Sequence, residues 1–195
     1  MPTPLKKIII ITAASGSGKT SIVKHLLKKN PEQLDFSISC ASRQKRNNEA
    51  DSIDYYFISP DEFKEKITKN EFVEWEMVYE GKYYGTLKTE LERIWVKNKT
   101  PLLDIDVKGA LAIQQLFPKE TLSIFIAPPS IAELKKRLEA RGTETPESLA
   151  TRVHKATDEI IFQPHFTTTI VNDNLQKAGA EAEELVRNFL QIRAN

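Results

Sequence analysis

The sequence is poor in cysteine and has no marked excess of either charge. Cys40 is the only cysteine among 195 residues, so no internal disulfide can form, which fits a reducing compartment. The 28 basic and 27 acidic residues nearly cancel, so nothing suggests the basic surface of a protein that binds nucleic acid or membranes. Any anion site must therefore be built locally.

Long apolar segments are also absent. The longest apolar run, residues 8–11, is far too short to cross a bilayer, and residues 1–7 lack the apolar stretch of a signal peptide. We therefore expect a cytoplasmic protein with neither a membrane nor a nucleic acid as partner. A chain of this length buries roughly 70% of its unfolded surface and needs no disulfide or metal to fold. Its oligomeric state is left open.

Hydrophobic patterning predicts an α/β fold with a parallel central sheet, because buried strands alternate with helices. The strands are expected at residues 8–12, 101–107, 122–127 and 168–171. Helices are expected from Lys19 to the stop at Asn30-Pro31, and at residues 131–139, 148–162 and about 175–192.

Residues 36–97 interrupt this alternation. Short strands are expected at residues 36–40, 55–58 and 83–84, with a helix at residues 60–70. The segment is therefore predicted to be an inserted mixed α/β lobe. The core then comprises about residues 1–35, 98–139 and 156–195, all within one domain.

A phosphate-binding loop is predicted where the first strand meets the first helix. The segment matches the phosphate-loop pattern at its Gly-Lys-Thr end, although alanine replaces the first glycine; it reads Ala13, Ala14, Ser15, Gly16, Ser17, Gly18, Lys19 and Thr20. Backbone N–H groups there converge on one anion, Lys19 can reach the β- and γ-phosphates, and Thr20 can join a Mg²⁺ shell. The alternative is a Gly/Ser turn followed by an exposed lysine.

Two aspartates, Asp104 and Asp106, are expected on one face of the second core strand, near its carboxyl end. Ligands of parallel sheets gather at that edge. One aspartate would then orient hydrated Mg²⁺, the role assigned to Asp104, and the other would meet the substrate. A structural network with a buried lysine or arginine is the alternative.

A phosphate loop indicates only nucleotide binding, and the acceptor depends on the rest of the chain. Several stretches, in this order and spacing, resemble those of guanylate kinases. They are Phe36-Ser37-Ile38-Ser39, Arg43 with Arg46, Asp54-Tyr55-Tyr56-Phe57, Glu71-Phe72-Val73-Glu74-Trp75, Tyr83-Tyr84-Gly85-Thr86, Leu103-Asp104-Ile105-Asp106, Ile126-Ala127-Pro128-Pro129-Ser130, Leu134-Lys135-Lys136-Arg137-Leu138, Arg141-Gly142-Thr143-Glu144-Thr145 and Ile170-Val171-Asn172-Asp173.

The resemblance implies a P-loop kinase that transfers the γ-phosphoryl of ATP to GMP, with Mg²⁺ as cofactor. It places the GMP phosphate on Arg43, Arg46, Tyr55 and Tyr84, and guanine among Ser39, Glu74, Thr86 and Asp106. Arginine forks suit a dianionic phosphate, and one carboxylate can accept both donors of guanine's N1–H and amino group. Adenine would present an acceptor to that carboxylate and leave buried groups unpaired.

The resemblance also implies a helical lid at about residues 140–155. Arg141 and Arg152 would point at the transferring phosphoryl and so join Lys19 and Arg43 in catalysis. Arg137 and Asn172 would contact ATP, Arg137 near adenine. Surface charge on a helix is the alternative for the arginines.

The chain departs from the family pattern at a few positions. Ala41-Ser42 replaces the usual threonine pair, Lys45 a proline, and Asn48 a glycine. These changes could soften the loop that binds the GMP phosphate, but they remove no proposed charge. Two other functions stay open: a peptide-binding module that has lost catalysis, and a related kinase for another phosphorylated acceptor.

Overall fold

The computed structural model describes residues 6–47, 49–140 and 146–191. Within these residues the chain forms, in order, β1 (Ile8–Ala13), α1 (Lys19–Lys29), β2 (Leu34–Ser37), β3 (Cys40–Ala41), β4 (Tyr56–Phe57), α2 (Pro60–Thr68), β5 (Phe72–Tyr79), β6 (Lys82–Leu87), α3 (Lys88–Val96), β7 (Thr100–Asp104), α4 (Val107–Leu116), β8 (Thr121–Ala127), α5 (Ile131–Ala140), α6 (Pro146–Ile160), the 3-10 helix η1 (Gln163–His165), β9 (Thr168–Val171) and α7 (Leu175–Leu190).

The core is a parallel sheet with helices on both faces, as the sequence predicted. Among the described residues it has five strands in the order β2-β7-β1-β8-β9, with every neighbouring pair parallel. Successive isoleucines of β1 face opposite sides: Ile8 and Ile10 pack with α3 and α4, whereas Ile9 and Ile11 pack with α1 and α7. A continuous β-branched run suits a strand that is buried on both faces.

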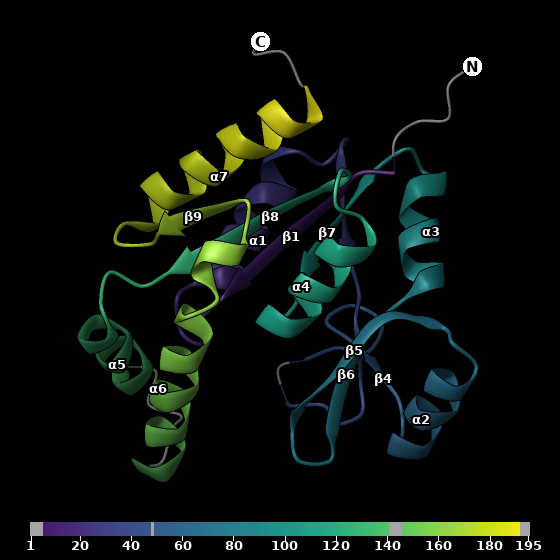
Figure 1. Cartoon of the computed structure of the whole chain (residues 1–195), viewed down its shortest axis with the longest axis horizontal. Coiled ribbons are helices and arrows are strands. Elements are labelled where there is room, and N and C mark those ends of the chain that lie inside the picture. Colours follow the sequence, from purple (N-terminus) through teal and green to yellow (C-terminus); the bar gives the residue numbers. More distant parts are fainter. Residues whose placement is uncertain (1–5, 48, 141–145, 192–195) are drawn as a thin grey trace.

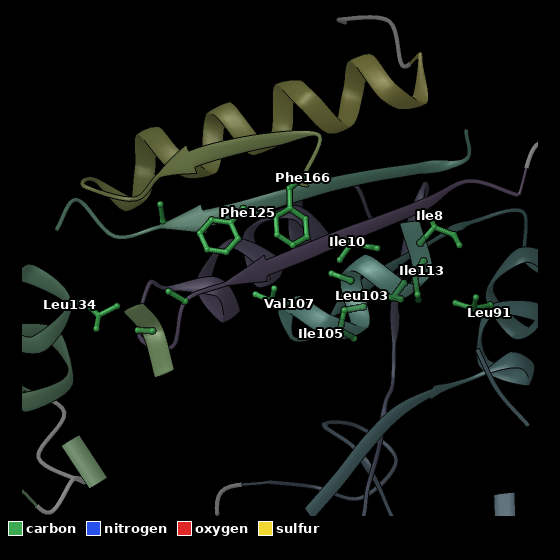
Figure 2. Close-up of a cluster of buried hydrophobic side chains, with 14 of the residues drawn as sticks. Ile8, Ile10, Leu91, Leu103, Ile105, Val107, Ile113, Phe125, Leu134 and Phe166 are labelled. Atoms are coloured by element: carbon green, nitrogen blue, oxygen red, sulfur yellow. The ribbon is translucent and has the colours of Figure 1, made fainter. Parts of the chain in front are cut away.

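Aromatic rings close the face that α3 and α4 cover. Phe125 of β8 stacks on Phe166, with ring centroids 5.5 Å apart, and Leu134 of α5 belongs to the same cluster (Figure 2). The same cluster contains Ala156 of α6, so it ties both α5 and α6 to the sheet.

A second sheet forms the inserted lobe. Its order is β4-β3-β6-β5, with β3 and β5 both antiparallel to β6 and β4 parallel to β3. Its own small core stacks Phe63 of α2 on Phe72, with ring centroids 4.4 Å apart. Figure 1 shows the lobe and the helices α5 and α6 extending from the same end of the core sheet.

The bounds of two predicted strands were wrong. The strand expected at residues 36–40 is divided: β2 belongs to the core sheet, and β3 begins the second sheet at Cys40. The strand expected at residues 101–107 ends at Asp104, and Asp106 instead caps α4, its carboxylate accepting a hydrogen bond from the Gly109 N–H at 2.9 Å. Asp104 and Asp106 therefore do not share a strand face.

The sequence reading gave no strand at residues 72–79 and no helix at residues 88–96, where the structure has β5 and α3. The search for membrane-crossing segments, restricted to the described residues, finds no helix that is both long enough and apolar enough.

Candidate active site

The phosphate loop leaves the carboxyl end of β1 and enters α1, as predicted. Gly16 and Gly18 have φ angles of 95° and 93°, which side-chain-bearing residues rarely adopt. Ala13, by contrast, ends β1 with an ordinary negative φ, so alanine is not strained there. Gly18 caps α1, and no side chain in the described chain caps it. The first N–H groups of α1 therefore suit an anion.

Lys19 is held by groups at the end of β7. Its Nζ lies 2.6 Å from Asp104 Oδ1 and donates to the Ile105 carbonyl at 3.1 Å. Burial disfavours the ammonium charge, but attraction to Asp104 outweighs it and raises the pKa of Lys19 above its ordinary value. Lys19 is therefore fully charged at neutral pH, and a bound polyphosphate would compete with Asp104 for it.

Asn172 braces the loop from behind. Its Nδ2 donates to the Ser17 carbonyl at 2.7 Å, and a side chain on Gly18 would clash with the same amide. Arg137 Nη1 donates to the Asn172 carbonyl at 2.8 Å. Neither residue lines the cleft described below, so the structure gives both a role in supporting the loop. Their contact with nucleotide stays a prediction.

Glu159 of α6 contacts the loop, and the sequence reading missed it. Its Oε2 accepts a hydrogen bond from the Ser15 N–H at 3.1 Å, while Lys155 Nζ lies 3.7 Å from Oε1. Burial raises the pKa of Glu159 above its ordinary value, although Lys155 opposes the shift. A phosphate that uses the Ser15 donor must displace this carboxylate. The available signal was position: Glu159 lies two helical turns after Arg152, on the same face.

Glu74 is a buried carboxylate in the second sheet. It is 7% exposed, and its Oε1 accepts a hydrogen bond from Thr86 Oγ1 at 2.6 Å across the β5–β6 ladder. Burial is the main cause that raises the pKa of Glu74 to about 7; the Thr86 bond opposes the shift and the nearby Asp106 adds to it. Each oxygen of the ionised carboxylate can accept more than one hydrogen bond, so this form suits a ligand that offers paired donors.

Arg43 is fixed in the lobe by a second carboxylate. Its guanidinium donates to both oxygens of Glu49, at 2.6 Å and 2.7 Å, and through Nε to the Tyr84 hydroxyl at 2.9 Å. These bonds raise the pKa of Arg43 and lower that of Glu49. The guanidinium also lies 5.1 Å from the centre of the Tyr55 ring. Glu49 thus holds the arginine that was predicted to bind phosphate.

Arg46 is more exposed than Arg43. Its side chain is 62% accessible, its Nη1 lies 3.7 Å from Glu49 Oε1, and its backbone N–H donates to the other oxygen of Glu49 at 2.9 Å. Glu49 therefore gathers both arginines around one carboxylate. The sequence reading overlooked Glu49, although its position three residues after Arg46 was visible.

One cleft of about 340 Å³ joins these groups. Most of the predicted site residues line it: Ala13, Ala14, Ser15, Gly16, Gly18, Lys19, Thr20, Ser39, Arg43, Arg46, Tyr55, Glu74, Tyr84, Asp104, Asp106 and Arg152. Ser17 and Thr86 are buried behind its wall. Arg141 lies outside the described residues. The core, the lobe and α6 each contribute to this single cleft.

A neighbouring space of about 330 Å³ separates Arg152 of α6 from Arg43 and Arg46 of the lobe. Cations from two separate parts of a fold that line one space suit an anion that both can contact. Within the described parts of the chain, no three His, Cys, Asp or Glu side chains cluster as a metal site.

Comparison with known proteins agrees with this geometry. The guanylate kinase family model matches residues 5–189. The chain is 44% identical over 186 residues to a guanylate kinase of Bacteroides fragilis, covering 95% of this chain and 91% of that one. It is also 44% identical over 186 residues to a guanylate kinase of Porphyromonas gingivalis, covering 95% and 99%.

Solved structures show the same fold. The guanylate kinase of Anaplasma phagocytophilum matches with a TM-score of 0.77 at 24% identity, covering 98% of this chain and 89% of that chain. The SH3-kinase fragment of tight junction protein 3 matches with a TM-score of 0.54 at 14% identity, covering 96% of this chain and 59% of that chain.

Proposed function

The chain belongs to the guanylate kinase family, the ATP:GMP phosphotransferases, and on this basis we propose specific roles for the residues of the cleft. The phosphate loop binds ATP, the lobe binds GMP, and the γ-phosphoryl passes between them to give ADP and GDP. One observation carries the proposal: the phosphate loop and the buried Glu74 line the same cleft, with Arg43 and Arg152 beside them.

Glu74 selects guanine. With Oε1 engaged by Thr86, the carboxylate can accept the N1–H and amino donors of guanine, and Ser39 and Asp106 line the same part of the cleft. Adenine would place its N1 lone pair against a buried carboxylate. We therefore expect the site to prefer guanine over adenine by about 10²-fold or more. The buried position of Glu74 makes that mismatch expensive.

Arg43, Arg46, Tyr55 and Tyr84 bind the GMP phosphate. Both Nη1 and Nη2 of Arg43 donate to Glu49. The phosphate must therefore replace this carboxylate or share the arginine with it. A dianion offers more acceptor oxygens than a carboxylate and can engage Arg46 at the same time. GMP binding therefore competes with Glu49 for the two arginines.

The transfer step needs little proton chemistry, because the attacking oxygen of GMP is already anionic. This oxygen forms a bond to the γ-phosphorus, the bond from that phosphorus to the oxygen shared with the β-phosphate breaks, and ADP departs with the electron pair. Lys19, Arg43 and Arg152 offset the repulsion between the two polyanions. Arg141, known here only from the sequence, is proposed to act with them.

Magnesium is proposed as the cofactor. The Thr20 hydroxyl and the Asp104 carboxylate are oxygen donors at the mouth of the phosphate loop, the type of ligand that Mg²⁺ prefers alongside substrate phosphates and water. When bound, the ion would neutralise phosphate charge. Asp104 would then exchange its present partner, Lys19, for the ion. The cytoplasm is the proposed location, which suits the single, buried Cys40.

A coupled assay of ADP formation tests the function. ATP and Mg²⁺ are supplied with GMP, AMP, CMP, UMP or a sugar phosphate, and we expect turnover with GMP to exceed that with each other acceptor by at least about 10²-fold. Equal turnover with all acceptors would refute guanine selection. Absence of turnover with every acceptor would favour the peptide-binding module instead.

The affinity for GMP is expected to fall as the pH decreases below about 7, because only the ionised form of Glu74 accepts both guanine donors. At pH 6 about one tenth of Glu74 would be ionised, so KM for GMP should be roughly tenfold higher than at pH 8. Steady-state kinetics at saturating ATP measure this change.

The phosphate of GMP also titrates, near pH 6. Glu74→Gln provides the matched control, since it keeps the phosphate titration and removes that of the carboxyl. If kcat/KM for GMP follows the same pH profile in parent and variant, Glu74 is not the titrating group.

A further inference from the structure

Gly109 lies against the carboxylate that we assign to guanine. It is in the first turn of α4, and a Cβ atom built on it would lie 2.5 Å from Glu74 Oε2 and 3.1 Å from Glu74 Cδ. Carbon atoms normally keep about 3.5 Å or more from non-bonded neighbours, so the carboxylate could not stay where it is. The sequence reading did not single out Gly109.

Backbone geometry does not explain this glycine. Gly109 is helical, and its φ is not among the positive values found elsewhere in the described chain. In a helix, glycine is less favourable than alanine by about 0.5–1 kcal/mol. The structure thus carries a residue that weakens α4 at the one place where a methyl group would touch Glu74.

Each oxygen of Glu74 has a different close neighbour. Thr86 Oγ1 holds Oε1 at 2.6 Å, and the Cα of Gly109 leaves space for Oε2. The same turn fixes Asp106, whose Oδ1 accepts from the Gly109 N–H at 2.9 Å. A methyl group at position 109 would rotate the carboxylate off Thr86 or push it toward the space meant for the base.

We propose that Gly109 is a specificity-determining residue for guanine, acting by leaving the space in which Glu74 is held for its ligand. The inference rests on the proposed function. Gly109 is a positioning residue, because it acts through Glu74 and lies outside the lining of the cleft. An ångström of displacement in such a contact typically costs about 10²-fold in rate or affinity.

Gly109→Ala tests the proposal. We expect KM for GMP to rise about 30- to 100-fold and selectivity over AMP to fall, while KM for ATP changes less than about twofold. The melting temperature should change little, because the gain from alanine in the helix offsets part of the cost of displacing Glu74. A merely structural glycine would lower the melting temperature and leave the ratio of the two KM values unchanged.

Gly179→Ala is the matched control. Gly179 is also a helical glycine, in α7, and the three atoms nearest to a Cβ there all belong to the His25 ring, at 3.3–3.4 Å. It should leave both KM values unchanged. If Gly109→Ala behaves like Gly179→Ala while the parent prefers GMP, the inference fails and the proposed function survives; if the parent shows no preference for GMP, the function itself fails.

A double-mutant cycle tests whether the effect of Gly109→Ala on GMP use depends on Glu74. In a Glu74→Ala background, Gly109→Ala should change kcat/KM for GMP by less than about threefold, because the group it displaces is absent. Measurement of kcat/KM in the linear range of substrate needs no saturation. An equally large loss in both backgrounds would show that position 109 acts through α4 or Asp106, and would overturn the proposal.

Discussion

Replacement of Lys19 by alanine is expected to lower kcat about 10²- to 10³-fold, the loss typical of removing one group that stabilises developing charge. Lys19 is the one cation that lies within the phosphate loop itself, and Asp104 keeps it charged until a polyphosphate arrives. Without it, the Asp104 carboxylate would face the β- and γ-phosphates directly. Initial rates at saturating ATP and GMP measure the effect.

Lys19→Met is the matched control, because methionine keeps most of the side-chain length and removes only the charge. Both variants should lose a similar factor in kcat, and calorimetry should show GMP affinity within about threefold of the parent, since Lys19 is not among the residues proposed to bind GMP. Normal transfer by either variant would contradict the assignment of the loop. A parallel loss of GMP affinity would point to general damage.

Glu74→Gln is expected to lower kcat/KM for GMP by about 10²- to 10³-fold, mainly through KM. The glutamine oxygen can still accept from Thr86, but its amide then presents donors to the donors of guanine. KM for ATP should not change, because Glu74 is not among the residues proposed to bind ATP. A variant that keeps the parental KM for GMP would remove Glu74 from the guanine site.

The same substitution should stabilise the fold at pH 8. Because burial raises the pKa of Glu74 to about 7, the folded state holds this proton more tightly than the unfolded state, so stability falls as the pH rises from about 4.5 to 7. Above pH 7 the ionised carboxylate costs about 3 kcal/mol. Glutamine avoids that cost, so its melting temperature should exceed that of the parent by about 6–12 °C at pH 8.

Thermal unfolding at pH 5 supplies the internal control, since the parental carboxyl is then largely protonated and the two proteins should melt at nearly the same temperature. A variant that is less stable than the parent at both pH values would show that Glu74 is structural. The opposite signs expected for stability and for GMP use identify a residue that the fold keeps for its ligand.

The central strands β1 and β8 were predictable because both are buried on both faces and therefore read as largely apolar runs, as in residues 8–11. Strand β5 was missed for the opposite reason. Its buried position 74 carries a carboxylate, so residues 71–76 read as a charged and solvated string. The site residue itself obscured the strand that holds it.

Asp106 illustrates a limit of another kind. Two aspartates spaced by one residue indicate a shared strand face only while the strand continues, and the chain instead turns at Ile105 and starts α4 with Asp106 as its cap. An aspartate before a helical segment is a standard cap signal, so this boundary could have been inferred. The predicted strand was therefore three residues too long at its carboxyl end.

Sequence alone determined the phosphate loop, the parallel core and the family, because these depend on local order: a strand, a glycine-rich turn and a helix in succession, followed by motifs in fixed spacing. Tertiary structure decided which charges meet. Glu159 reaches Ser15, Glu49 closes on Arg43, and Gly109 makes room for Glu74. These contacts join segments distant in the chain or depend on side-chain direction, and the burial and charged partners that shift the pKa values exist only once the chain is packed.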